Sequence, residues 1–324
     1  MNKDRKNYIK SCEVSEVTTL NLGGSLQKIA VEGKSKNLPV VIALHGGPGT
    51  PAPFSVGCRG LFPQLTDSAV MVYWDQLGCG INNCKLGNGV TIENFVQMTC
   101  DLVKEIKTRF PQNKVYLLGI SWGSVLALKT AVRIPELLNG ALVFGQIVSD
   151  LFFNEEVSAA FDSAPLKISS KARKFIAAGA GADPKTLKKS LAGLTKLIKK
   201  YTDGYDNKNS RPAEIKGVIK GLLNSPDYKF KDFTAIVKNG YLKNDSLWGE
   251  LIKINLSGCF AEVKIPYRIL QGDTDLAALT SAAVKAVNNS QNPLVSVRVL
   301  KNSGHLPSEE AMQIMFEELR ELIK

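Results

Sequence analysis

Short, continuous apolar runs recur in both the N-terminal and C-terminal parts of the chain and alternate with helical patterns. The clearest run is Pro-Val-Val-Ile-Ala-Leu at 39–44, and further predicted strands lie at 70–74, 115–118, 141–144, 267–270 and 295–300. A strand that is apolar at every position is typical of a sheet covered on both faces. Between the runs, apolar residues recur every three or four positions, as in 95–110 and 312–323. This alternation predicts an α/β fold, a mostly parallel sheet with helices on both faces.

The alternation of strands and helices is interrupted once. It stops after the run at 141–144 and resumes at 267–270, and the sequence between these runs has helical patterns but no strong strand pattern. We therefore predict that residues 1–145 and 262–324 form the sheet-containing core. Residues 146–261 are predicted to form a helical cap inserted on top of the sheet.

Composition and charge argue against a disordered chain and against a nucleic-acid-binding protein. The chain has 324 residues, 44% of them hydrophobic, which is enough to bury a large core. Of the net charge of +11, residues 151–260 contribute +8, from 19 Lys or Arg against 11 Asp or Glu. These lysines lie in helical patterns with few aromatic residues between them, which favours solvated helix faces over a nucleic-acid site.

The sequence also predicts the cellular location and the binding partners of the protein. No apolar run approaches the roughly 20 residues of a membrane span, and no apolar segment follows the basic N-terminus to make a signal peptide. We expect a cytoplasmic protein that binds neither membrane nor nucleic acid and whose partner is a small-molecule or short-peptide substrate. The sequence does not predict an oligomeric state.

Six cysteines are too few for a disulfide scaffold, and they lack the paired C-x-x-C spacing of a zinc site. We interpret them mainly as buried small apolar residues and predict no metal. Cys79 and Cys84 lie in one loop rich in Gly and Asn, and an oxidising compartment would allow them to pair. The sequence leaves that pairing open.

A candidate nucleophile follows one of the predicted strands. Gly-Ile-Ser-Trp-Gly at 119–123 comes directly after the run at 115–118 and before a helical pattern at 124–132. A sharp turn from strand to helix lifts the serine hydroxyl above the sheet, and glycines let the backbone pack closely around it. The alternative is that Ser121 is an ordinary turn residue. Its strand-turn-helix context favours a nucleophile.

Serine needs a base to take its proton and an acid to orient that base. The chain has only two histidines, His45 and His305, and His305 follows the last predicted strand. Two carboxylates, Asp273 and Asp275, follow the strand before it. We choose Asp275 as the acid because G-x-x-D is the more usual spacing in such hydrolases, and we interpret Asp273 as a turn-stabilising residue.

A glycine-rich turn is the candidate oxyanion hole. His-Gly-Gly-Pro-Gly at 45–49 follows the run at 39–44, and its glycines leave the backbone free to point amide groups into a cleft. We assign one donor to Gly47 and the other to the amide of Trp122. A phosphate-binding loop is the competing interpretation, but no G-K-[ST] follows. His45 ends the strand, and we interpret it as structural.

Three motifs together resemble a known family. His-Gly-Gly-Pro-Gly at 45–49, Trp-Asp-Gln at 74–76 and Gly-Ile-Ser-Trp-Gly-Ser at 119–124 resemble the proline iminopeptidase branch of the α/β-hydrolase superfamily. The resemblance implies an α/β-hydrolase fold and a serine hydrolase that removes an N-terminal residue, often proline, from small peptides. By position it implies Ser121 as nucleophile, Asp275 as acid and His305 as base, without a cofactor.

The chain departs from this family at Leu77, where arginine is usual, and in its basic insertion. An aminopeptidase must bind an ammonium group, normally through carboxylates of the cap. Glu155 and Glu156 are the candidates, with Gln146 as a polar neighbour at the end of a strand. The alternative is that both glutamates are ordinary surface residues.

The sequence therefore predicts a serine hydrolase that forms an acyl-enzyme, with short peptides or amino-acid amides as the leading substrate class. An esterase acting on small acyl esters would use the same triad and would need no carboxylate in the cap. A hydrolase fold that only binds, without catalysis, is the third alternative.

Overall fold

The computed structural model describes residues 3–149, 151–211 and 215–324. Its strands are β1 (Val14–Leu22), β2 (Ser25–Gly33), β3 (Val40–Leu44), β4 (Val70–Trp74), β5 (Val115–Ile120), β6 (Gly140–Phe144), β7 (Tyr267–Gly272) and β8 (Val295–Leu300). Its α-helices are α1 (Lys3–Ser11), α2 (Pro63–Thr66), α3 (Ile92–Arg109), α4 (Trp122–Arg133), α5 (Glu155–Ala159), α6 (Leu166–Gly179), α7 (Pro184–Tyr201), α8 (Ile215–Leu223), α9 (Phe230–Thr234), α10 (Asp245–Ile252), α11 (Cys259–Glu262), α12 (Thr280–Ser290) and α13 (Glu309–Ile323). Four 3₁₀ turns are η1 (Val56–Cys58), η2 (Gly80–Asn82), η3 (Pro135–Leu137) and η4 (Gly240–Lys243). No helix in the described ranges is both long enough and apolar enough to cross a membrane.

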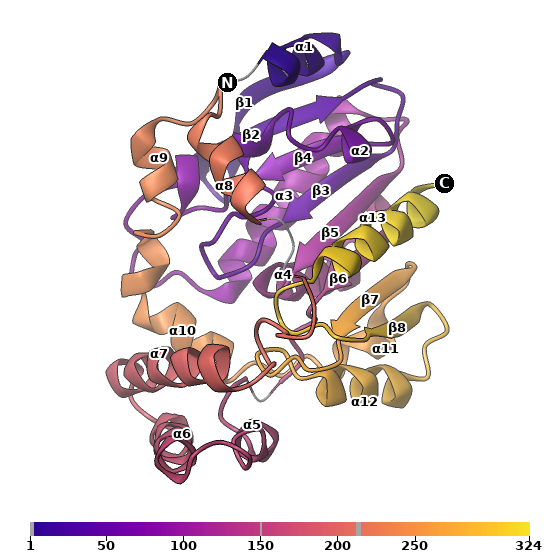
Figure 1. Ribbon diagram of the computed structural model, residues 1–324. Coiled ribbons are helices and arrows are strands. Elements are labelled where there is room, and N and C mark those ends of the chain that lie inside the picture. The colour runs from indigo at the N-terminus through magenta and orange to yellow at the C-terminus, as the bar shows by residue number, and fades with distance from the viewer. Residues whose placement is uncertain (1–2, 150, 212–214) are drawn as a thin grey trace.

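All eight strands form one sheet in the order β1-β2-β4-β3-β5-β6-β7-β8 (Figure 1). The pairs β1–β2 and β2–β4 are antiparallel, and the remaining pairs are parallel. The prediction of a mostly parallel sheet is confirmed, and the six runs predicted as strands form β3 to β8. Because the central strands run in one direction, β5, β6 and β7 all end at the same edge of the sheet.

The two faces of the sheet each carry a hydrophobic core. In β3, Val40, Ile42 and Leu44 join one core, and Val41 and Ala43 join the other. Successive side chains of a strand point to opposite faces, so a strand buried on both sides must be apolar at every position. Helices α3, α4, α11 and α12 supply side chains to the first core, and α2 and α13 to the second.

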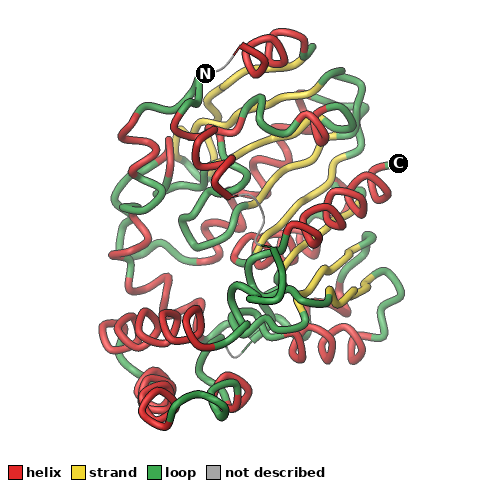
Figure 2. Tube along the Cα trace, in the orientation of Figure 1, coloured by secondary structure: helices red, strands yellow, loops and turns green. Residues whose placement is uncertain are grey.

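The described residues between β6 and β7 form helices α5 to α11 and no strand (Figure 2). Helices α5 to α7 have a small core of their own, made by side chains such as Phe161, Leu194 and Ile198. Leu276 and Leu279, which follow β7, belong to the same cluster. The insertion therefore packs on the loop that leaves β7.

A second part of the insertion, around α8 and α9, is fixed to the core by charged side chains. Arg59 Nε and Nη2 donate to the two carboxylate oxygens of Asp227 at 2.9 and 2.6 Å, and both side chains are largely buried. The Tyr228 hydroxyl donates to Asp75, whose carboxylate also accepts from the amides of Val56 and Ile81. Burial raises the pKa of Asp75 to about 6. The aspartate of the Trp-Asp-Gln motif is thus an anchor for the insertion.

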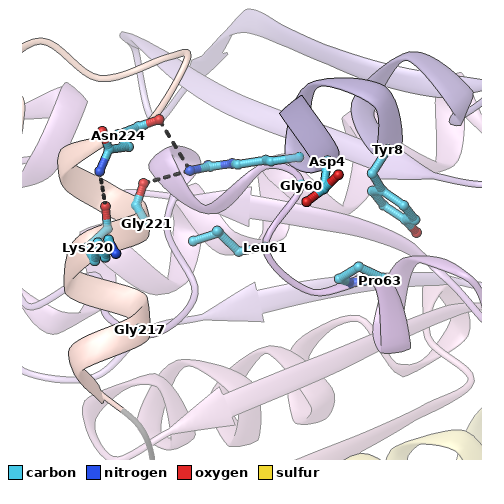
Figure 3. A pocket seen from close by; sticks show the side chains of 10 residues that line it. Asp4, Tyr8, Gly60, Leu61, Pro63, Gly217, Lys220, Gly221 and Asn224 are labelled. Carbon is cyan, nitrogen blue, oxygen red and sulfur yellow. Dashed lines mark hydrogen bonds between the residues drawn. The ribbon is translucent and has the colours of Figure 1, made fainter. Parts of the chain in front are cut away.

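A cavity of about 830 Å³ lies between α1, α8 and the loop before α2. Figure 3 shows Asp4 and Tyr8 on one side of this cavity and Lys220 on the other. Arg5 also lines it, and its guanidinium donates to the carbonyl of Gly221 at 2.6 Å. None of the candidate catalytic side chains lines it, so it is separate from the site described next.

Candidate active site

Ser121 stands at the sharp turn between β5 and α4. Its backbone has φ 51° and ψ −115°, a left-handed conformation that costs a non-glycine residue about 1–3 kcal/mol. The flanking glycines permit the turn. A Cβ on Gly123 would lie 1.9 Å from the carbonyl oxygen of Leu44, and one on Gly119 would lie 2.8 Å from the carbonyl oxygen of Gly123. The start of α4 therefore packs directly against the end of β3.

The structure brings Ser121, His305 and Asp275 together in one hydrogen-bonded chain. Ser121 Oγ lies 2.8 Å from His305 Nε2, and His305 Nδ1 lies 2.9 and 3.1 Å from the two carboxylate oxygens of Asp275. An ionised carboxylate only accepts, so Nδ1 carries the proton and Nε2 is left to accept the serine proton. Ser121 and His305 are 8% and 9% exposed, so charges that develop here are weakly screened by water.

Asp275 and Asp273 have different partners. Asp275 is buried, and its carboxylate accepts from the amides of Ala277 and Ala278 at 2.8 and 2.9 Å and from Gln271 Nε2 at 3.3 Å. Asp273 is exposed and accepts from the backbone amides of residues 302 and 303, both at 3.1 Å. Asp275 therefore contacts the imidazole, and Asp273 braces the loop that carries it.

The glycine-rich loop at 45–49 runs beside the serine. Gly47 has φ +119°, and a Cβ there would lie 2.5 Å from the amide nitrogen of Gly49, so only glycine fits. A Cβ on Gly46 would be 3.4 Å from that of Ser121. On the other side, Trp122 is the first residue of α4, a position whose amide has no acceptor within the helix. Both assigned oxyanion donors thus belong to segments that border Ser121.

One hydrogen-bonded network ties these two segments together, and we did not predict it. Trp122 Nε1 donates to Gln76 Oε1 at 2.7 Å, and Gln76 Nε2 donates to the carbonyl of His45 at 3.2 Å. His45 Nε2 accepts from the Gln76 amide at 3.0 Å, and its Nδ1 donates to the carbonyl of Gly46 at 2.8 Å. Complete burial lowers the pKa of His45 to about 4, which keeps the ring neutral. Gln76 lies in a quoted motif, but no spacing rule indicates its partners.

The predicted substrate-binding side chains have partners other than Ser121, His305 and Asp275. Gln146 is fully buried, donates to the carbonyl of Ile147 at 2.7 Å and accepts from the Tyr267 hydroxyl at 2.7 Å. Glu155 and Glu156 are exposed in the first turn of α5, and Glu156 accepts from Ser281 Oγ at 2.5 Å. Within the part of the chain that the structure describes, no hydrogen bond or ion pair links these three side chains to Ser121, His305 or Asp275. Their assignment remains a prediction.

Among the described residues, the cysteines form no disulfide. All six cysteines are free thiols, with Cys79 buried and Cys84 exposed, so the two that could have paired are separate here. Within the described ranges, no group of three or more His, Cys, Asp or Glu side chains is arranged to hold a metal ion.

Comparison with known proteins identifies the family. The model of the alpha/beta hydrolase fold family matches residues 39–311. The chain therefore belongs to the alpha/beta hydrolase fold family.

Individual relatives indicate one branch of this family. A probable aminopeptidase of Bacillus subtilis, YbaC, is 26% identical over 298 residues, 90% of this chain and 91% of its own length. A proline iminopeptidase of Saccharolobus solfataricus is 25% identical over 90% of this chain and 86% of its own length. The crystal structure of a proline iminopeptidase from Mycobacterium smegmatis superimposes with a TM-score of 0.66 over 95% of this chain and 97% of its own, at 17% identity. The resemblance to the proline iminopeptidase branch is confirmed.

Proposed function

We propose that this chain is a serine hydrolase of aminopeptidase type that acts on short peptides or amino-acid amides through Ser121, His305 and Asp275. The observation that carries the proposal is the continuous path from Ser121 Oγ through both nitrogens of His305 to Asp275. This is the arrangement that activates a weak hydroxyl nucleophile. The aminopeptidase and proline iminopeptidase relatives support the choice of substrate class.

The reaction follows from these contacts. The Ser121 oxygen attacks the substrate carbonyl while its proton passes to His305 Nε2. The negative oxygen that forms is placed next to the amides of Gly47 and Trp122, and each such donor contributes about 10²- to 10³-fold to turnover. His305 then gives its proton to the leaving amine, which departs and leaves the acyl-enzyme. Water, deprotonated by the same histidine, releases the acid and restores the serine.

The first test is a side-by-side panel of aminoacyl-naphthylamides and nitrophenyl esters, together with labelling by a fluorophosphonate. An aminopeptidase should turn over aminoacyl-naphthylamides with a free N-terminus, and the fluorophosphonate should label one serine. If only esters are turned over, the proposed substrate class is wrong, but the proposal of a serine hydrolase stands. Absence of labelling in folded protein would contradict the hydrolase itself.

The substrate class has a sharper test in N-acetylation. If a cap carboxylate such as Glu155 or Glu156 binds the substrate ammonium, acetylating that group leaves a desolvated carboxylate unpaired. We then expect kcat/KM to fall by more than about 10²-fold, at roughly 1.4 kcal/mol per factor of ten. The measurement is the ratio of kcat/KM for the free and N-acetylated forms of one aminoacyl substrate.

Glu155→Gln and Glu156→Gln serve as matched variants in that measurement. The variant that removes the ammonium partner should bring the ratio close to one, and the other should keep it high. A high ratio in both would exclude both glutamates. A ratio near one in the wild type would reject the aminopeptidase and leave the triad untouched.

The second candidate is an esterase on small acyl esters, and one observation favours it. A carboxylate that selects strongly for an ammonium group must be shielded from water, whereas Glu155 and Glu156 are both exposed. An esterase would use the same triad and oxyanion donors and would show no penalty for N-acetylation.

The turn around Ser121 gives a further test of the proposed nucleophile. In Gly123→Ala the new methyl group meets the carbonyl oxygen of Leu44, so α4 and β3 must move apart. We expect a loss of about 1–3 kcal/mol in the free energy of unfolding. We also expect about a 10²-fold loss of labelling rate, because small displacements of a nucleophile are costly.

Gly249→Ala in α10 is the matched control, because no atom lies within 4 Å of a Cβ at that position. Alanine there should stabilise the helix by up to about 1 kcal/mol and leave the labelling rate unchanged. Urea unfolding and the rate of fluorophosphonate labelling measure both variants. If the Gly123→Ala protein is destabilised but is labelled at the wild-type rate, the geometry of this turn is not required for attack by Ser121.

A further inference from the structure

Three consecutive residues of the insertion, 203–205, bind both loops that carry the acid and the base. We call them the strap. The carbonyl of Asp203 accepts from Thr274 Oγ1 at 2.8 Å, and that of Gly204 accepts from the amide of Leu276 at 3.1 Å. These two donors flank Asp275 in the chain. The third strap carbonyl, of Tyr205, accepts from the amide of Leu306 at 2.9 Å, next to His305.

The strap and these loops approach so closely that glycine is needed on both sides. A Cβ on Gly304 would lie 2.6 Å from the Tyr205 carbonyl oxygen and 2.7 Å from that of Asp203. A Cβ on Gly204 would lie 2.4 Å from Leu276 Cδ1. The strap therefore packs tightly against the residues that neighbour Asp275 and His305 in the chain.

The Tyr205 side chain contacts the histidine itself. Its ring centroid lies 5.5 Å from that of His305, with 50° between the ring planes. The Nζ atom of Lys199, at the end of α7, lies 4.0 Å from the centre of the same tyrosine ring. A cation at that distance attracts the ring face, so Lys199 helps to hold Tyr205 in place.

We propose that the strap positions the triad, with the Tyr205 ring as the surface that fixes the tilt of the His305 imidazole. The inference rests on the proposed serine hydrolase. The two nitrogens of His305 are held by Ser121 and Asp275, but bonds at the two nitrogens leave the ring free to tilt about the line that joins them. The Tyr205 ring, packed against the imidazole at a 50° angle, restricts that freedom. The helical insertion, which delivers the strap, thereby controls the geometry of the catalytic base.

The test uses the rate at which a fluorophosphonate labels Ser121, which requires no knowledge of the natural substrate. In Tyr205→Ala we expect about a tenfold or larger loss in the rate of the covalent step. In Tyr205→Phe the ring remains, and we expect labelling within about twofold of the wild type. If phenylalanine preserves the labelling rate that alanine loses, the contribution of Tyr205 comes from its ring and not from its hydroxyl.

Phe175→Ala is the matched control for loss of an aromatic ring from the insertion. Phe175 is also partly buried and also lies beneath a lysine, Lys171, at 5.9 Å, but it packs against Gly193 in the insertion instead of against the triad. We expect this variant to lower the melting temperature and to label at the wild-type rate. If Phe175→Ala and Tyr205→Ala lose labelling rate equally, the strap only stabilises the fold. That result would overturn the proposal.

A proton NMR signal gives a second readout that stability alone does not move. The chain has only two histidines, so the downfield imidazole region is sparse, and His305→Gln identifies the Nδ1 proton shared with Asp275. That resonance should be present in the wild type and in Tyr205→Phe, and it should broaden or vanish in Tyr205→Ala. A wild-type rate and an unchanged resonance in Tyr205→Ala would contradict the proposal. Failure of the wild type to label would contradict the hydrolase instead.

Discussion

Ser121→Ala is expected to abolish turnover and to leave the fold intact. The side chain is small and largely buried, and alanine removes only the hydroxyl that donates to His305 Nε2. Loss of a triad nucleophile costs on the order of 10⁶ in turnover. The measurements are kcat on the best substrate of the panel, fluorophosphonate labelling and the circular dichroism spectrum.

Labelling distinguishes this residue from the other serines of the chain. Mass spectrometry of the labelled wild type should place the adduct on Ser121, and the adduct should be absent from Ser121→Ala. Ser124, which lies three residues later in the first turn of α4, provides the comparison, and Ser124→Ala should label normally. Persistent labelling of Ser121→Ala at another serine would show the assignment of the nucleophile to be wrong.

The fold, and the choice of Ser121, Asp275 and His305 as candidates, came from local patterns in the sequence. A strand buried on both faces must be apolar throughout, so the runs at 39–44, 70–74 and 115–118 marked the central strands. In a parallel sheet, residues that follow β5, β7 and β8 all lie at one edge, whatever their distance in sequence. Ser121, Asp275 and His305 could therefore be proposed before any distance was known.

The residues that support the site carry no such pattern. Gln76 and His45 act through hydrogen bonds to two segments that meet only in three dimensions, and single side chains have no periodicity to read. The same holds for Gln271, which donates to Asp275 and to the carbonyl of Ala278. A polar residue at the end of a predicted apolar strand is the sequence signal that points to such residues.

The insertion was the least predictable part, for a physical reason. Its helices are amphipathic, and amphipathic patterns identify a buried face without saying which partner it packs against. Nothing in the sequence of 203–205 indicates that three carbonyls meet the loops around Asp275 and His305. For the same reason the sequence could not tell that Glu155 and Glu156 would be exposed.

Asp275→Asn is expected to keep the fold and to lower turnover by about 10⁴-fold. The asparagine side chain fits the same space, but its amide group can donate to His305 Nδ1, which favours the tautomer with the proton on Nε2. That tautomer cannot accept the proton of Ser121. Steady-state kcat and the melting temperature of the two proteins are the measurements, and the melting temperature should change much less than the rate.

Asp273→Asn is the matched control, because it makes the same chemical change two residues away. Asp273 accepts from the backbone amides of residues 302 and 303 and does not touch the imidazole. Asparagine keeps one acceptor oxygen there, so we expect a loss of turnover of less than about tenfold, through looser placement of the loop that carries His305. The ratio between the two variants is the decisive quantity, because it cancels general effects of removing a carboxylate from this edge of the sheet. If Asp273→Asn is the more damaging change, then Asp273 is the acid and the role of Asp275 is structural.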